Sequence, residues 1–97
     1  MATYIMLLNY TDQGIRNVKD SPNRSDAAKA LAQNLGGEFK QVYLTLGAYD
    51  LVVVLELPDD VAAAKFALTR GALGNIRTTT LKAFNEAEYR DIIAALP

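Results

Sequence analysis

The fold is decided by the segment LGAYDLVVVLE, residues 46–56, in which a glycine turn leads into five consecutive apolar residues. Three of those five are valine, a residue that favours strands. A strand without polar alternation must be covered on both of its faces. The segment therefore predicts a central strand, residues 50–57, in a small sheet that is covered on each side.

Helix and strand signals on both sides of this segment predict the order β-α-β-β-α-β plus a terminal helix. Strands are expected at residues 3–9, 38–46, 50–57 and 75–84. Helix caps are expected at Thr11, Ser21, Asp59 and Asn85. Because Ser21 precedes a proline, we expect the first helical region in two pieces with a bend near Asp20.

This order is the split β-α-β, ferredoxin-like arrangement, an α+β fold with an antiparallel sheet and helices on one face. Right-handed crossovers place the first and third strands in the centre, and these are the two most continuously apolar strands. Residues 1–97 are expected to form one domain. Two crossover helices cover only one sheet face, so we expect a homodimer, or a multiple of dimers, paired back to back. The alternative is that the tail helix folds under its own sheet.

Side-chain alternation gives further expectations for the faces of three elements. Residues 38–46 have mixed faces, which suits an edge strand, with Phe39, Gln41 and Tyr43 on one face and Lys40, Val42 and Leu44 on the other. The helix after Asp59 is expected to contact the core through Val61, Ala64, Phe66 and Leu68. The terminal helix carries an apolar stripe of Tyr89, Ile92, Ile93 and Leu96, which is expected to dock on protein.

Composition excludes several classes of function. Ten basic and eleven acidic residues give a net charge of −1, so no basic field favours nucleic acid. The absence of cysteine excludes disulfides and thiolate metal sites, and the absence of histidine removes the usual general base near neutral pH. We expect no cofactor and no metal. No secretory signal or membrane-spanning apolar run is present, so a soluble cytoplasmic protein is expected.

The chain resembles the GYD domain family, small bacterial proteins of mostly undefined role. The resemblance rests on residues 8–16, 19–22, 36–37, 43–50, 58–60 and 73–78. The naming motif is represented by Gly47, Tyr49 and Asp50, with Ala48 inserted. The resemblance covers nearly the whole chain to about Phe84 and implies membership of the dimeric α/β-barrel superfamily.

A second, more distant resemblance concerns the hairpin alone. The pattern Thr-x-Gly-x-Tyr-Asp before an apolar strand looks like a turn in the effector-binding domain of Lrp/AsnC-type regulators, where that turn helps to line a small-molecule pocket between subunits. The resemblance implies ligand contact by Thr45, Gly47, Tyr49 and Asp50, with Arg77 as a further candidate. No helix-turn-helix segment accompanies it here.

Four of these residues also have a structural interpretation. Gly47 supplies the positive φ that a hairpin needs. Asp50, at the head of an apolar strand, is expected to accept hydrogen bonds from its own turn, and Tyr49 is expected to cap the sheet edge. Arg77 needs an acidic partner if it faces the interior, and Asp50 and Glu56 are available. Possible anion contacts are Arg16, Lys19, Arg24 and Arg77.

Three hypotheses of function follow. The first, which we favour, is a small ligand-binding or sensing module that acts as an oligomer and has its site near the hairpin or between subunits. The second is a small dimeric-barrel enzyme of monooxygenase or isomerase type, which a deep apolar cavity between helices and sheet would favour. The third is an assembly or partner-binding protein with a filled core. The sequence identifies no catalytic residue.

Overall fold

The computed structural model describes residues 1–97 and contains one antiparallel sheet. Its strands are β1 (Ala2–Tyr10), β2 (Glu38–Leu44), β3 (Leu51–Leu57) and β4 (Ile76–Ala83), in the spatial order β2-β3-β1-β4. The first and third strands are therefore central, as the crossover rule predicts. The predicted α+β, ferredoxin-like fold is confirmed.

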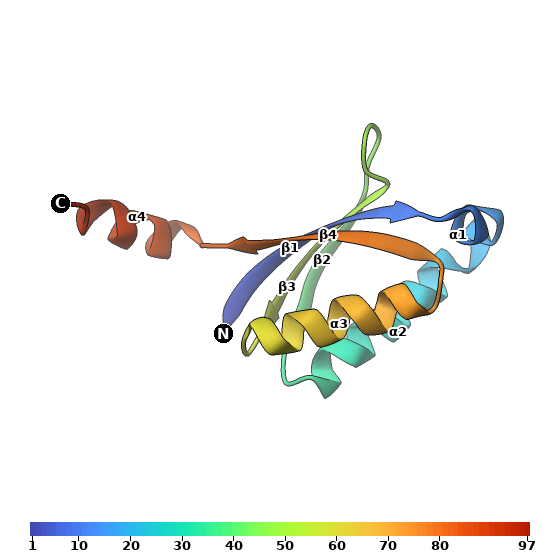
Figure 1. The fold of residues 1–97 in the computed structure, drawn as a ribbon, viewed down its shortest axis with the longest axis horizontal. Helices are drawn as coiled ribbons and strands as arrows, with labels where there is room; N and C mark the ends of the chain where they lie inside the picture. Colours follow the sequence, from blue (N-terminus) through green and yellow to red (C-terminus); the bar gives the residue numbers. More distant parts are fainter.

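The helices lie on one face of the sheet or beyond its ends (Figure 1). The two crossover helices, α2 (Ser21–Asn34) and α3 (Asp60–Ala72), cover the same face. Short helices α1 (Asp12–Arg16) and η1 (Val18–Asp20) join β1 to α2, which gives the expected interruption near Asp20. The terminal helix α4 (Glu86–Ala94) extends away from the sheet beyond β4. No helix combines the length and the apolar character that a bilayer crossing needs.

The core lies between the sheet and these two crossover helices. Tyr4, Met6 and Leu8 of β1 alternate with half-buried residues and point into it, as do alternate residues of β3. Val53, Leu55 and Leu57 supply the contribution of β3. The continuous apolar run of β3 therefore buries only every second residue against the helices of its own chain.

Side-chain caps begin three of the helices where the sequence predicts them. Thr11 accepts a hydrogen bond from the Gly14 amide at 3.0 Å, and Asp59 accepts one from the Ala62 amide at 2.9 Å. Asn85 forms a reciprocal capping box with Glu88. These caps depend on residues within three positions of one another, which is why the local sequence predicts them.

The predicted cap at Ser21 is wrong. Ser21 is already helical, with φ −54° and ψ −42°, and the residue at the cap position is Asp20, which makes no side-chain capping bond. The turn η1 runs directly into α2, so no extended residue is available to cap it. The Ser21 hydroxyl instead forms a 2.8 Å hydrogen bond with the hydroxyl of Tyr10.

The faces predicted for β2 are also partly wrong, although β2 is the edge strand expected. Its pairing with β3 shifts between Phe39 and Gln41, where Lys40 has no partner. An extra residue of this kind reverses the alternation of side chains after it. Phe39 and Val42 therefore pack against the same core, whereas strict alternation places them on opposite faces.

The face of α3 that meets the sheet differs from the prediction. The buried residues are Ala62, Ala63, Phe66 and Arg70, and among the expected contacts only Phe66 is one of them. Val61 and Leu68 are 62% and 74% exposed. Alanines lie on several sides of this helix, so hydrophobic periodicity does not select one face. The observed stripe at intervals of four residues ends at an arginine.

The sheet face opposite the helices, here called the helix-free face, carries apolar residues of three strands. Its apolar members are Ile5, Leu7, Val52, Val54 and Leu81, which the strand register brings into adjacent positions. The first four are half-buried and Leu81 is 45% exposed. The stripe expected on the terminal helix is likewise exposed: Tyr89, Ile92 and Ile93 of α4, and Leu96 just beyond it, are between 44% and 60% accessible. Thus α4 does not dock under its own sheet.

Candidate functional site

The hairpin of residues 45–50 projects beyond the end of the sheet as a closed loop (Figure 1). The Thr45 hydroxyl donates to the Tyr49 carbonyl at 2.7 Å, and the Thr45 amide donates to the Asp50 carbonyl at 2.9 Å. Gly47 lies at the tip with φ 121°, the left-handed region that glycine adopts without steric cost. The structural interpretation of Gly47 therefore holds.

The carboxylate of Asp50 accepts its hydrogen bond from a neighbouring strand and not from its own turn. One oxygen of its carboxylate accepts a 2.9 Å hydrogen bond from the Tyr10 amide, and its own amide donates to the Leu8 carbonyl at 2.9 Å. These bonds tie the hairpin to the end of β1, and the Asn9 side chain adds a 2.8 Å bond to Ala48. The expected carboxylate bonding is present, but its donor lies forty residues away in the chain.

Arg77 does not join this group. It is exposed, lies opposite Asn9 in the β1–β4 register, and forms no ion pair with Asp50 or Glu56. None of the five main hollows of the molecule is lined by Thr45, Gly47, Tyr49, Asp50 or Arg77. A ligand site at the hairpin, completed by another subunit, stays a prediction.

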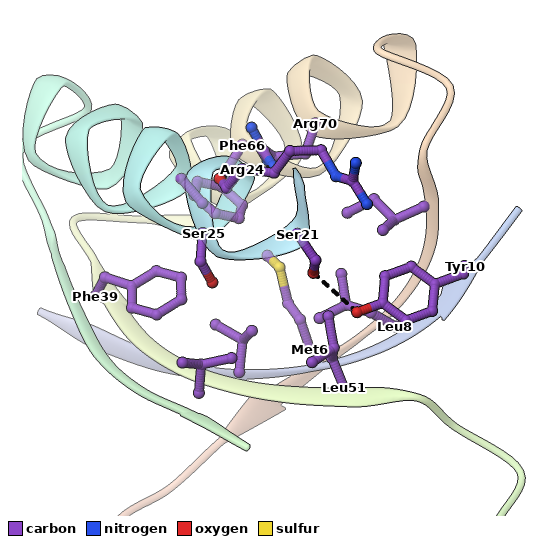
Figure 2. A pocket seen from close by; sticks show the side chains of 14 residues that line it. Met6, Leu8, Tyr10, Ser21, Arg24, Ser25, Phe39, Leu51, Phe66 and Arg70 are labelled. Carbon is purple, nitrogen blue, oxygen red and sulfur yellow. Dashed lines mark hydrogen bonds between the residues drawn. The ribbon is translucent and has the colours of Figure 1, made fainter. Parts of the chain in front are cut away.

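A cavity of about 40 Å³ lies instead between the crossover helices and the sheet. Figure 2 shows its wall of side chains, with Phe39 at one end and the bonded pair Tyr10 and Ser21 at the other. Ten of its fourteen lining residues are hydrophobic, and none is acidic. An open groove of about 490 Å³ shares Tyr10, Ser21 and Ser25 with it, so the two hollows adjoin.

Arg70, the last residue of the buried α3 stripe, lines this cavity and is only 8% exposed. Its Nη2 donates a 3.0 Å hydrogen bond to the Arg24 carbonyl, and it forms no ion pair. Burial, and then the positive charge of Arg24, lower the pKa of Arg70 from its ordinary value. A buried cation without a carboxylate is unusual, because desolvation of a charge needs compensation.

Arg24, on α2, is the second arginine of the cavity wall. Its two terminal nitrogens donate to the carbonyls of Asn17 and Gly14, at 3.0 and 3.3 Å, so it holds the α1–η1 segment against α2. Arg24 was among the possible anion contacts predicted from sequence. Arg16 and Lys19, two others, are exposed and line none of the main hollows.

Three hydroxyl groups complete the polar part of the wall. The hydroxyls of Tyr10 and Ser21 are bonded to each other. Ser25, one turn along α2, directs its hydroxyl between helix and sheet (Figure 2) and forms no side-chain hydrogen bond with the protein. The wall of the cavity therefore combines a free hydroxyl and two arginines with mainly apolar side chains, a combination typical of small-molecule sites.

A further polar pair, in which only the tyrosine is buried, lies at the other end of the sheet. Tyr4, in the core, donates a 2.5 Å hydrogen bond to Asp60 at the start of α3. Burial, followed by this bond and the nearby negative charge, raises the pKa of Tyr4 to about 12. The phenol therefore stays neutral and acts as a donor that ties β1 to α3. No group of three or more acidic side chains comes together as a metal-ligand set.

The fold and the cavity define a small α+β module of ferredoxin-like topology. The chain belongs to the GYD domain family, whose model matches residues 4–93. The match continues through most of α4, beyond Phe84, where we expected the characteristic residues to end.

Among solved structures, the chain is similar to the protein TTHA0845 from Thermus thermophilus. The two are 30% identical, with a TM-score of 0.50, over 88% of this chain and 95% of the other. No curated protein matches the chain. The family and this neighbour identify the fold and the kind of domain. Any function has to be inferred from the geometry of the site.

Proposed function

We propose that the protein is a small-ligand-binding module whose site is the cavity between α2, α3 and the sheet. The observation that carries this proposal is Arg70, which is buried, forms no ion pair and lines a cavity that has no acidic residue in its wall. A polar group that is desolvated and left without a counter-charge costs stability, and proteins retain such groups mainly at functional sites. The adjoining groove opens the cavity towards solvent.

Binding is favoured over a reaction by the chemistry of the wall. The enzyme hypothesis expects a deep apolar cavity in this place, and the location agrees with it. However, the cavity is small, and its polar side chains are arginine, serine and tyrosine. These groups donate hydrogen bonds and positive charge, whereas proton abstraction near neutral pH requires a group of suitable pKa.

The module is proposed to act as a homo-oligomer. The helix-free face and the stripe on α4 leave two apolar surfaces of the same chain without a partner. An isolated helix as short as α4 is marginal in water, so packing against protein is needed to hold it. A second copy offers sheet and helix together, and its presence would also bring another subunit to the hairpin.

Filling the cavity is expected to abolish ligand binding without unfolding the protein. Ser25→Leu places a branched side chain in the opening, and it removes a hydroxyl that bonds to no protein group. In an NMR screen of fragment-sized molecules, the native protein is expected to show saturable shifts at amides of α2, α3 and β3. The Ser25→Leu protein is expected to lose them.

Ala30→Leu provides the matched control. Ala30 lies on the same helix, is exposed, and lines neither hollow, so the same side chain there leaves binding unchanged. Fragments that shift only residues of the hairpin, or that bind Ser25→Leu as well as the native protein, would contradict the cavity as the site.

A further inference from the structure

We propose that the ligand of this cavity is a small organic anion, a carboxylate with a short apolar body, whose charged group binds Arg70. This inference rests on the proposed function and adds the chemical class of the ligand. It is argued from three features: the unused donors of Arg70, the charge of the wall, and the apolar groove outside.

The guanidinium group of Arg70 has donors that the protein does not use. Arginine carries five N–H donors in a planar fork, and only one hydrogen bond is formed here, to the Arg24 carbonyl. No buried side-chain nitrogen or oxygen is sealed off without a partner, so the remaining donors of Arg70 are accessible, and Arg70 lines both the cavity and a surface depression. A carboxylate matches two such donors at once.

The charge around the cavity is positive and uncompensated. Arg24 and Arg70 both line it, and no aspartate or glutamate does. Two acids lie in neighbouring hollows. Asp26, in the groove, pairs with Lys29 at 3.9 Å, whereas Asp20 shares a surface depression with both arginines but forms no ion pair with either. The protein therefore leaves the position of the counter-ion to a ligand.

The volume of the cavity and the side chains of the adjoining groove indicate the size and character of the ligand beyond its carboxylate. A cavity of about 40 Å³ accommodates a carboxylate group but little more. The adjoining groove continues over Val18, Val42, Leu44 and Leu51, which are apolar. A short hydrocarbon body that leaves the cavity past Ser25 would lie on these side chains, so its affinity is expected to rise with chain length.

Matched pairs of a carboxylate and its primary amide test the inference directly. The probes are acetate, butyrate, hexanoate and benzoate with the corresponding amides, titrated at constant ionic strength and followed by NMR. We expect each carboxylate to bind about ten- to a hundredfold more tightly than its amide, the range for a charge-assisted hydrogen bond. Affinity along the alkyl series is expected to rise about fourfold for each buried methylene.

Arg70→Met keeps the length of the side chain and removes its charge, so the preference for carboxylate over amide is expected to fall to about unity. Arg77→Met makes the same change on the opposite sheet face and is expected to keep the preference. Arg70→Lys is expected to keep part of it, and this variant serves if Arg70→Met does not fold.

The outcomes separate the two proposals. Saturable binding at the cavity with equal affinity for acids and amides would overturn the anion and leave the ligand-binding function standing. Loss of the preference in Arg77→Met, with Arg70→Met unaffected, would move the anion site to the other face of the sheet. Binding of neither member of any pair would count against both proposals.

Discussion

Replacing Val54 by aspartate is expected to split the proposed homodimer into folded monomers, whereas the same change at Val53 is expected to abolish folding. The two residues are adjacent in β3 and point to opposite faces. Val53 is 6% exposed and belongs to the core beneath the helices, while Val54 is half-buried on the helix-free face. An unpaired carboxylate in the core costs several kcal/mol, about the whole stability of a small domain.

Val54 lies between Ile5 and Gln41 in the strand register, near the middle of the helix-free face. In a monomer, an aspartate there remains in contact with water, and the fold survives. In a back-to-back pair of sheets the charge would be buried, so association is lost. Sedimentation velocity and circular dichroism at micromolar concentration measure both properties. A native protein that sediments only as monomer, or a Val54→Asp protein that remains a dimer, would contradict this account.

The second large effect is expected for Gly14→Ala. A methyl group on Gly14 would lie 1.9 Å from the backbone carbonyl oxygen of Asn75, a distance that no real contact allows. This approach holds α1 against the segment before β4, where the Thr11 amide also donates to the Asn75 carbonyl at 3.1 Å. Relief of the clash requires the backbone to move, so unfolding free energy is expected to fall by about 2–3 kcal/mol.

Gly71→Ala is the matched control for that substitution. Gly71 lies within α3, and a methyl group there meets nothing within 4 Å. Alanine in this half-buried helical position, where a methyl group has room, is expected to raise the unfolding free energy by about 0.5–1 kcal/mol. Chemical denaturation of the two variants should therefore give changes of opposite sign. Equal and small effects would show that the approach of α1 to Asn75 is loose.

Local signals predicted those parts of the fold that depend on neighbouring residues. The caps at Thr11, Asp59 and Asn85 and the central position of β3 follow from short patterns. The irregularity at Lys40 does not, because it depends on how β2 pairs with β3. The inward face of α3 could not be read either, since an alanine-rich helix has apolar residues on several sides.

The same limit explains why the sequence did not reveal the cavity. A positive φ at Gly47 follows from the turn, so the hairpin could be described in advance. Arg70 gave no such signal, because an arginine near the end of a helix is normally solvated and its burial depends on which face of α3 meets the sheet. The one sequence pattern that could have indicated the burial of Arg70 is the spacing of Ala62, Phe66 and Arg70 at intervals of four residues, which places them on the same face of the helix.

A crystal structure of the protein soaked with butyrate tests most directly the claim that the cavity is a ligand site. The account predicts butyrate with its carboxylate bonded to the guanidinium group of Arg70 and its alkyl chain leaving past Ser25 towards Leu51. Butyrate bound at the hairpin beside Tyr49 and Asp50, or a cavity that holds only water in crystals saturated with butyrate, would contradict it.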